Sequence, residues 1–203
     1  MKILGIVGSP RHGRNTATLV QRVLDGAKSR GADVSLLYIS DYDIAPCDAC
    51  DGCKQTAECV LEDGMRTFYA AIDGIQGLVL GTPIYFDHVS AQTKLFLDRL
   101  YALVGPDMER YFPAGAKSVL VATWGDSDPD LYNDVIDWLK GRLSLYHGVE
   151  TVAAITAADA DGVPPGKRPE LLQAAFDAGV KQRAAAKFHK YCSSTQNCDN
   201  YPR

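Results

Sequence analysis

Four of the six cysteines in this 203-residue chain fall within one short stretch, CDACDGCKQTAEC, which runs from residue 47 to residue 59. Cys47, Cys50, Cys53 and Cys59 are spaced as Cys-x2-Cys-x2-Cys-x5-Cys. The first three repeat the spacing that places thiolates around an iron–sulfur cluster in ferredoxins, and the fourth can complete a four-thiolate site. Structural zinc sites usually combine two separated Cys-x2-Cys pairs. The spacing therefore favours a [4Fe–4S] cluster, with free redox-active thiols and a zinc site as the alternatives.

A second stretch with recognisable chemistry is GSPRHGRNT, which lies between an apolar run and a helical pattern. The side chains in it that can donate to an anion or balance its charge are Ser9, Arg11, Arg14, Asn15 and Thr16. The unpaired N–H groups and the positive dipole end of the following helix add to them, so the loop suits a phosphate monoester. The alternative is a turn whose Ser and Asn only cap the helix, which leaves the two arginines unexplained. The dinucleotide motif Gly-x-Gly-x-x-Gly and the P-loop motif Gly-Lys-Ser/Thr do not occur in the sequence.

Two further loops carry aromatic residues just beyond apolar runs. The first, TPIYFDHVSAQTK, contributes Pro83, Ile84, Tyr85 and Phe86, whose stiff backbone and aromatic rings can hold a flat ring system. The alternative is that its two aromatic residues belong to the core or to a dimer interface. The second loop, TWGDSDPD, contributes Thr123, Trp124 and Gly125 as a third wall. A phosphate loop, a flat-ring loop and a third wall together predict a site for flavin mononucleotide, FMN.

These loops can form one site only if the elements around them bring their ends together. Apolar runs that resemble strands alternate with helical patterns along the whole chain. The predicted strands are Lys2–Val7, Asp33–Ile39, Leu78–Thr82, Ser118–Thr123 and Val152–Ala157. The predicted helices are Thr16–Ala27, one capped by Asp63, one capped by Ser90, Leu131–Tyr146, and one that Pro169 opens and that ends near Tyr191. This alternation predicts a three-layer α/β domain with a parallel sheet, in which ligands bind beyond the carboxyl ends of the strands.

Composition and charge limit the domain count and the classes of function. Hydrophobic residues make up 46% of the chain, and its length suits one domain with a full core. We expect this domain to span residues 1–190, with a cysteine-rich loop at 41–63, and a mobile polar tail at 191–203 to hold Cys192 and Cys198 as bystander thiols. A net charge of -4 without a basic stripe argues against nucleic acid, and no apolar run approaches the ~20 residues of a membrane span. We therefore expect a cytoplasmic protein, in which thiols stay reduced.

The segments GSPR-x-x-x-NT and TPIYF-x-x-x-SAQ-x-K-x-F-x-DR, with the cysteine loop, resemble the flavodoxin-like NAD(P)H-dependent FMN reductase family, most of all its iron–sulfur flavoprotein branch. The similarity spans about Lys2 to Lys187. It implies a flavodoxin-like sandwich with a five-stranded parallel sheet in the order 2-1-3-4-5. It also implies that FMN contacts Ser9, Arg11, Asn15 and Thr16 at its phosphate, Pro83 to Phe86 along its isoalloxazine, and Thr123, Trp124 and Gly125 at the third loop. Family members usually have Gly directly before the Asn-Thr pair, where this chain has Arg14.

The resemblance implies an FMN-dependent oxidoreductase that passes electrons from NAD(P)H to a small acceptor, such as a quinone, a nitro or azo compound, a free flavin or a metal ion. The flavin supplies the chemistry, and no side-chain acid or base is required. Two alternatives are an iron–sulfur flavoprotein that accepts electrons from a ferredoxin-like partner, and a thiol or metal redox sensor on the same scaffold. The resemblance further implies a homodimer or homotetramer, for which the aromatic residues Tyr101, Tyr111 and Phe112 offer an interface. Because the cysteine loop follows the second strand, we expect it at the edge of the flavin loops, with enough length to reach toward a neighbouring subunit.

Overall fold

Five parallel strands form the centre of the computed structural model, which describes residues 1–56 and 58–185. They are β1 (Lys2–Val7), β2 (Asp33–Tyr38), β3 (Gly77–Tyr85), β5 (Lys117–Thr123) and β6 (Glu150–Ala157). The strand order is β2-β1-β3-β5-β6, and each neighbouring pair is parallel. This confirms the predicted order 2-1-3-4-5, because β4 (His88–Val89) does not lie on that path. The short β4, which the sequence did not predict, pairs antiparallel with the end of β3.

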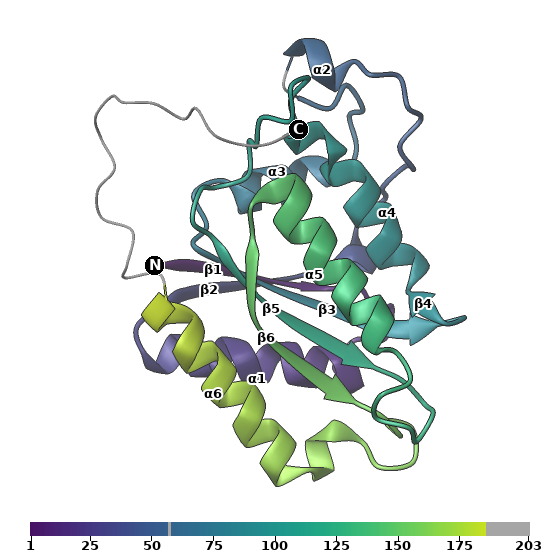
Figure 1. Cartoon of the computed structure of the whole chain (residues 1–203), viewed down its shortest axis with the longest axis vertical. Helices are drawn as coiled ribbons and strands as arrows, with labels where there is room; N and C mark the ends of the chain where they lie inside the picture. Colours follow the sequence, from purple (N-terminus) through teal and green to yellow (C-terminus); the bar gives the residue numbers. More distant parts are fainter. Residues whose placement is uncertain (57, 186–203) are drawn as a thin grey trace, which may run out of the picture.

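Helices cover both faces of the sheet, so the predicted three layers are confirmed (Figure 1). One face carries α1 (Asn15–Ser29) and α6 (Pro169–Ala185). The other carries α3 (Met65–Ile72), α4 (Ala91–Arg99) and α5 (Asn133–His147). Within residues 1–56 and 58–185, three 3-10 turns and one further short helix complete the elements: η1 (Ile39–Asp41), α2 (Cys53–Thr56), η2 (Leu100–Leu103) and η3 (Pro165–Lys167).

The central strand β3 has an apolar sequence throughout, and burial on both faces explains why. Its buried stretch runs from Gly77 to Ile84. Val79 belongs to the core under α1 and α6, whereas Leu78 and Leu80 belong to the core under the other three helices. Successive side chains of a strand point to opposite faces, so a strand that is covered on both faces needs apolar residues at every position.

Helices α1 and α6 pack closely because each carries a glycine at their contact. A Cβ atom on Gly26 would lie 1.9 Å from the carbonyl oxygen of Phe176, and one on Gly179 would lie 1.9 Å from that of Val23. Only glycine permits backbones to approach this closely. Helix α1 runs two residues beyond the predicted end at Ala27, to Ser29, and Gly31 follows it with a φ of 78°.

Helix α4 is capped as predicted but buries an unexpected face. The Ser90 side chain accepts a hydrogen bond from the Thr93 N–H at 3.2 Å. The fully buried positions are Thr93, Phe96 and Arg99, followed by Leu100, rather than a stripe of leucines. The leucines of this helix do not form one inner stripe, because a charged residue occupies part of its inner face.

Some sequence expectations fall outside the described part of the chain. The polar tail, the end of the last helix near Tyr191, and Cys192 and Cys198 all lie in residues 186–203, which the structure does not describe. Among the described residues, no helix has the length and apolar character to cross a membrane.

Candidate active site

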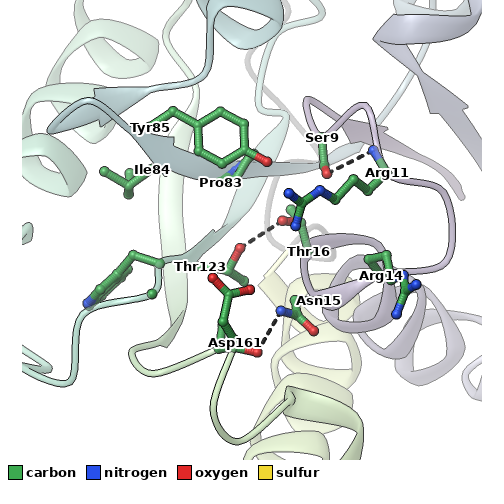
Figure 2. A pocket seen from close by; sticks show the side chains of 13 residues that line it. Ser9, Arg11, Arg14, Asn15, Thr16, Pro83, Ile84, Tyr85, Thr123 and Asp161 are labelled. Carbon is green, nitrogen blue, oxygen red and sulfur yellow. Dashed lines mark hydrogen bonds between the residues drawn. The ribbon is translucent and has the colours of Figure 1, made fainter.

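A pocket opens at the carboxyl edge of the sheet, where the three predicted loops meet (Figure 2). Its lining comprises Ser9, Arg11, Arg14, Asn15, Thr16, Pro83, Ile84, Tyr85, Thr123, Trp124, Gly125, Ala160 and Asp161. Every residue predicted to contact the cofactor belongs to this lining except Phe86, whose side chain is fully exposed. The topology brings these loops together because the carboxyl ends of parallel strands share one edge.

The phosphate loop leaves the start of α1 open to an anion. Arg14 is the residue before the helix and makes no side-chain capping bond, and the first turn has no acidic residue. Arg14 has extended backbone, with φ −94° and ψ −168°, so its departure from the family glycine carries no strain. The left-handed conformation of this loop falls instead on Gly13, with φ 63°. Backbone donors and the positive end of the helix therefore remain available to a phosphate group.

A buried polar network supports the phosphate loop from behind. The Ser90 hydroxyl donates to the Gly8 carbonyl oxygen at 2.7 Å, and the Thr93 hydroxyl donates to Thr82 Oγ1 at 3.0 Å. Gly8 must be glycine, since a Cβ there would lie 1.8 Å from Thr93 Oγ1. Sequence reasoning identified Ser90 only as a helix cap and missed this second role. Because these hydroxyls are fully buried and bonded, they fix the backbone of the loop.

The ring side of the pocket ends in a tight hairpin between β3 and β4. Phe86 and Asp87 at its tip have φ values of 52° and 61°, which is the backbone of a type I′ turn. Tyr85 is partly exposed beside the pocket, while Ile84 is buried. The Asp87 carboxylate accepts a hydrogen bond from the Tyr132 hydroxyl at 2.8 Å, and this bond raises the pKa of Tyr132. That contact ties the hairpin to the start of α5.

The third wall is anchored in the core through its tryptophan. The Trp124 indole is buried, packs edge-on against Tyr132, and donates from Nε1 to the Asp128 carbonyl oxygen at 3.0 Å. Gly125 follows it at the pocket. At the floor, the hydroxyls of Thr16 and Thr123 lie 2.8 Å apart and share a hydrogen bond. The phosphate loop and the third loop thus touch directly.

A fourth wall, formed by Ala160 and Asp161, was missed in the sequence. These residues follow β6, and the Asn15 side-chain amide donates to the Ala160 carbonyl oxygen at 2.7 Å. One proton of Asn15, which was predicted to face the phosphate, therefore holds this wall. The available signal was positional: a loop that follows the fifth parallel strand must reach the same edge as the others.

The four predicted metal ligands lie elsewhere. Cys47 and Cys50 are exposed, Cys53 and Cys59 are partly buried, and all four are free thiols that line one hollow at the carboxyl end of α4. Figure 1 shows α2 beyond that end of α4, whereas β4 lies at its beginning. The expectation that the cysteine loop sits at the edge of the flavin loops is therefore wrong. A long connection has its path set by tertiary contacts rather than by the strand that precedes it.

Arg99 makes those contacts. Its side chain is 1% exposed, and its guanidinium donates to the Ala45 carbonyl oxygen at 2.7 Å and to Asp63 at 2.5 and 3.1 Å. It also donates to Cys59 Sγ at 3.3 Å. Burial alone would raise the pKa of Asp63, but the Arg99 hydrogen bond and the N–H groups of Ala45 and Met65 lower it. Arg99 therefore joins both ends of the cysteine loop to one of its thiols.

The sequence profile of the NADPH-dependent FMN reductase family matches residues 1–128, which is more than half of the chain. The chain belongs to that family. Family membership makes it an FMN-dependent oxidoreductase, and its curated relatives place it in the iron–sulfur flavoprotein branch.

Those relatives match only part of their length. An iron–sulfur flavoprotein of Methanosarcina thermophila is 30% identical over 139 residues, which cover 68% of this chain and 73% of the relative. One of Methanocaldococcus jannaschii is 35% identical over 99 residues, covering 49% of this chain and 51% of the relative. One of Archaeoglobus fulgidus is 35% identical over 124 residues, covering 61% and 62%.

Solved structures show the flavodoxin-like fold. The NAD(P)H:quinone oxidoreductase of Methanothermobacter marburgensis superposes with a TM-score of 0.71 at 14% identity, covering 94% of this chain and 99% of that one. An NADH:FMN oxidoreductase gives a TM-score of 0.64 at 20% identity, covering 91% and 89%. At these identities the likeness concerns architecture alone.

The residues of this family member differ in how well they fit its implied cofactors. The pocket fits FMN, because an open helix start and two arginines face one end while Pro83 and Tyr85 form a wall at the other. The cysteine hollow fits an iron–sulfur cluster in its donor chemistry, since four thiols line it. Its arrangement does not yet form a ligand sphere: within residues 1–56 and 58–185, no three His, Cys, Asp or Glu side chains are gathered closely enough to hold a metal ion.

Proposed function

We propose that this chain passes electrons from NAD(P)H to a small acceptor at FMN bound in the carboxyl-edge pocket. The acceptor classes are those expected from the sequence: a quinone, a nitro or azo compound, a free flavin or a metal ion. The observation that carries the proposal is the convergence of three loops, far apart in the sequence, on one pocket with a cationic end and an aromatic wall. Bound FMN would supply hydride acceptance and both one- and two-electron transfer.

The protein's own contribution is binding, orientation and shielding. Arg11, Arg14 and the start of α1 would hold the phosphate by charge and by N–H donors. The Ser90 and Thr93 hydroxyls keep the loop backbone fixed, so the loop would lose little conformational entropy when the phosphate binds. Pro83 and Ile84 would exclude water from one side of the ring, and the partly exposed Tyr85 leaves a way in for NAD(P)H and the acceptor in turn.

Reduction by pyridine nucleotide tests this function directly. The purified chain, reconstituted with FMN and desalted, should keep a flavin spectrum, and anaerobic NADH or NADPH should bleach it. Heat-denatured chain carried through the same steps is the control. If the native chain keeps no more flavin than the denatured control, the proposed pocket is wrong.

A second role is favoured by the four cysteines and by the relatives' names. We infer that Cys47, Cys50, Cys53 and Cys59 hold one [4Fe–4S] cluster in protein made without oxygen, with a ferredoxin-like protein as an electron donor. The Arg99 contact to Cys59 supports this, because a charge-assisted hydrogen bond stabilises a thiolate ligand. Iron and acid-labile sulfide should be measured per chain in anaerobic protein, with Cys50→Ala as the matched variant. Near-zero iron in protein that binds FMN would leave the cysteines as thiols.

Assembly into a homodimer or homotetramer is part of this proposal. The cysteine hollow lies at the carboxyl end of α4, and Ser90 at its beginning is bonded to the phosphate loop, so an assembly that sets the hollow of one chain beside the pocket of another would bring a cluster closer to a flavin. Tyr101 and Tyr111 are partly exposed and available for such an interface, whereas Phe112 is buried in the core and is not. Light scattering at micromolar concentration tests this, and a monomeric mass contradicts it.

A further inference from the structure

The fourth wall of the pocket is held in place on three sides. At its start, backbone hydrogen bonds continue beyond the ends of β5 and β6. The Trp124 N–H donates to the Ala157 carbonyl at 3.0 Å, and the Ala160 N–H donates to the Trp124 carbonyl at 2.9 Å. Asn15 bonds the Ala160 carbonyl from the phosphate loop. Arg168 donates to the Asp159 carbonyl at 2.8 Å from the other side. The backbone that carries Asp161 is therefore fixed relative to both the phosphate loop and the third loop.

Asp161 brings a carboxylate to this rim without a partner of its own. Its side chain lines the pocket, and its Oδ2 would lie 3.1 Å from a Cβ built on Gly125. Figure 2 shows the carboxyl group between Thr123 and Asn15, facing the cavity. Among the described residues, no hydrogen bond or ion pair engages this carboxylate. An ionised carboxylate accepts hydrogen bonds and donates none, so the site calls for a ligand that donates.

The position of Asp161 in the pocket determines which part of the ligand it would contact. On one side lie Asn15 and Thr16 of the phosphate loop, and on the other lie Thr123 and Gly125 of the third wall. The part of FMN that joins its phosphate to its ring is the ribityl chain, which carries hydroxyl donors. A phosphate oxygen beside Asp161 would be repelled, and a single carboxylate is a poor site for Ca²⁺ or Mg²⁺, which take six or more oxygen ligands.

We propose that Asp161 accepts hydrogen bonds from the ribityl hydroxyls and so sets the position of the cofactor between the phosphate loop and the ring wall. This inference rests on the proposed FMN site and adds a binding residue beyond the part of the chain that the family profile covers. Asp161 repels the phosphate as well as binding the hydroxyls, so its net effect depends on which flavin is bound.

Three flavins separate these effects: lumiflavin, which has the ring alone, riboflavin, which adds the ribityl chain, and FMN, which adds the phosphate. Their dissociation constants should be measured by calorimetry for the unaltered chain, for Asp161→Ala, and for Asp73→Ala, an exposed carboxylate that follows α3 at the opposite edge of the sheet. For Asp161→Ala, riboflavin affinity should fall roughly tenfold to a hundredfold. Lumiflavin affinity should stay unchanged, and FMN should lose less than riboflavin because a repulsion is removed too.

The outcomes are distinct. Unchanged riboflavin affinity, or an equal loss for lumiflavin and riboflavin, overturns the role of Asp161 while leaving the FMN site standing. Asp73→Ala should match the unaltered chain for all three flavins. An affinity loss equal to that of Asp161→Ala would mean that the Asp161 effect comes only from the change in net charge. Failure of the unaltered chain to bind any of the three flavins overturns the proposed function together with this inference.

Discussion

Replacing Arg99 by Met should destabilise the fold, because the Arg99 guanidinium bonds both ends of the cysteine loop. The side chains of Arg99 and Asp63 are 1% and 15% exposed, and the guanidinium also bonds the Ala45 carbonyl and Cys59. Removing one partner of a buried ion pair costs ~3–5 kcal/mol, because the other charge stays buried without compensation. Asp63 retains some contact with solvent, so we expect the lower end, about 3 kcal/mol. That is a large part of the ~5–15 kcal/mol by which domains are usually stable.

The same helix provides the matched control. Lys94 and Asp98 form an ion pair whose side chains are 49% and 48% exposed. Exposed pairs on a helix contribute only ~0.3–0.5 kcal/mol, so Lys94→Met should barely move the urea midpoint. Both variants should be unfolded in urea at neutral pH, with the free energy of unfolding obtained by linear extrapolation.

Limited proteolysis adds a local measurement. The bonds of Arg99 reach Ala45 at one end of the loop and Asp63 at the other, so the loop between them should be cleaved faster in Arg99→Met than in Lys94→Met. The reasoning is refuted if Arg99→Met loses less than about 1 kcal/mol, the upper range for an exposed pair, or if loop cleavage is the same in both variants.

Three further perturbations follow from the structure. The double change Asn15→Ala and Thr16→Ala should weaken FMN binding by ~1.5–3 kcal/mol for each lost bond to a charged group, and unchanged affinity in a flavin titration would contradict the loop assignment. Burial lowers the pKa of His147 from 6.5 to about 4 in the folded protein. Between these pH values the unfolded chain binds a proton that the folded protein does not, so stability should fall as the pH drops from 6.5 toward 4. The expected loss is about 3 kcal/mol, at about 1.36 kcal/mol per pKa unit. His147→Leu should flatten that part of the pH profile, and a profile with the same slope would exclude His147 as its source. Gly179→Ala should cost ~1–3 kcal/mol by overpacking, whereas Gly141→Ala, with nothing within 4 Å of the added Cβ, should stabilise α5; equal effects would contradict the close approach of α1 and α6.

The sheet and the pocket could be predicted because period and topology determine them. Continuous apolar runs such as the one in β3 identify strands that are covered on both faces, and alternation with helices implies parallel pairing. Once the order is 2-1-3-4-5, the loops after the strands must meet at one edge. Ser9, Tyr85 and Gly125 could therefore be assigned to one site before any coordinates were known.

What could not be predicted depends on contacts that leave no period in the sequence. The hairpin that forms β4 has Phe86 and Asp87 at positive φ, without the Asn-Gly or Asp-Gly pair that usually signals such a turn. Asp161 belongs to no motif, and only its strand's place in the sheet brings it to the pocket. Arg99 ends the SAQ-x-K-x-F-x-DR segment, but nothing in that segment shows that it is buried, because its burial follows from the loop that covers it.

Helix α4 relates the two candidate sites to each other. Ser90 caps its beginning and, with Thr93 in its first turn, supports the phosphate loop, while its last residue, Arg99, holds the cysteine loop. The helix has nine residues, which at ~1.5 Å per residue makes it about 13 Å long. Its middle is fixed by Phe96, which is fully buried against Phe68 of α3. Because one packed helix carries the supports of both sites, the distance between pocket and cysteine hollow within a chain is set by the core and not by either loop.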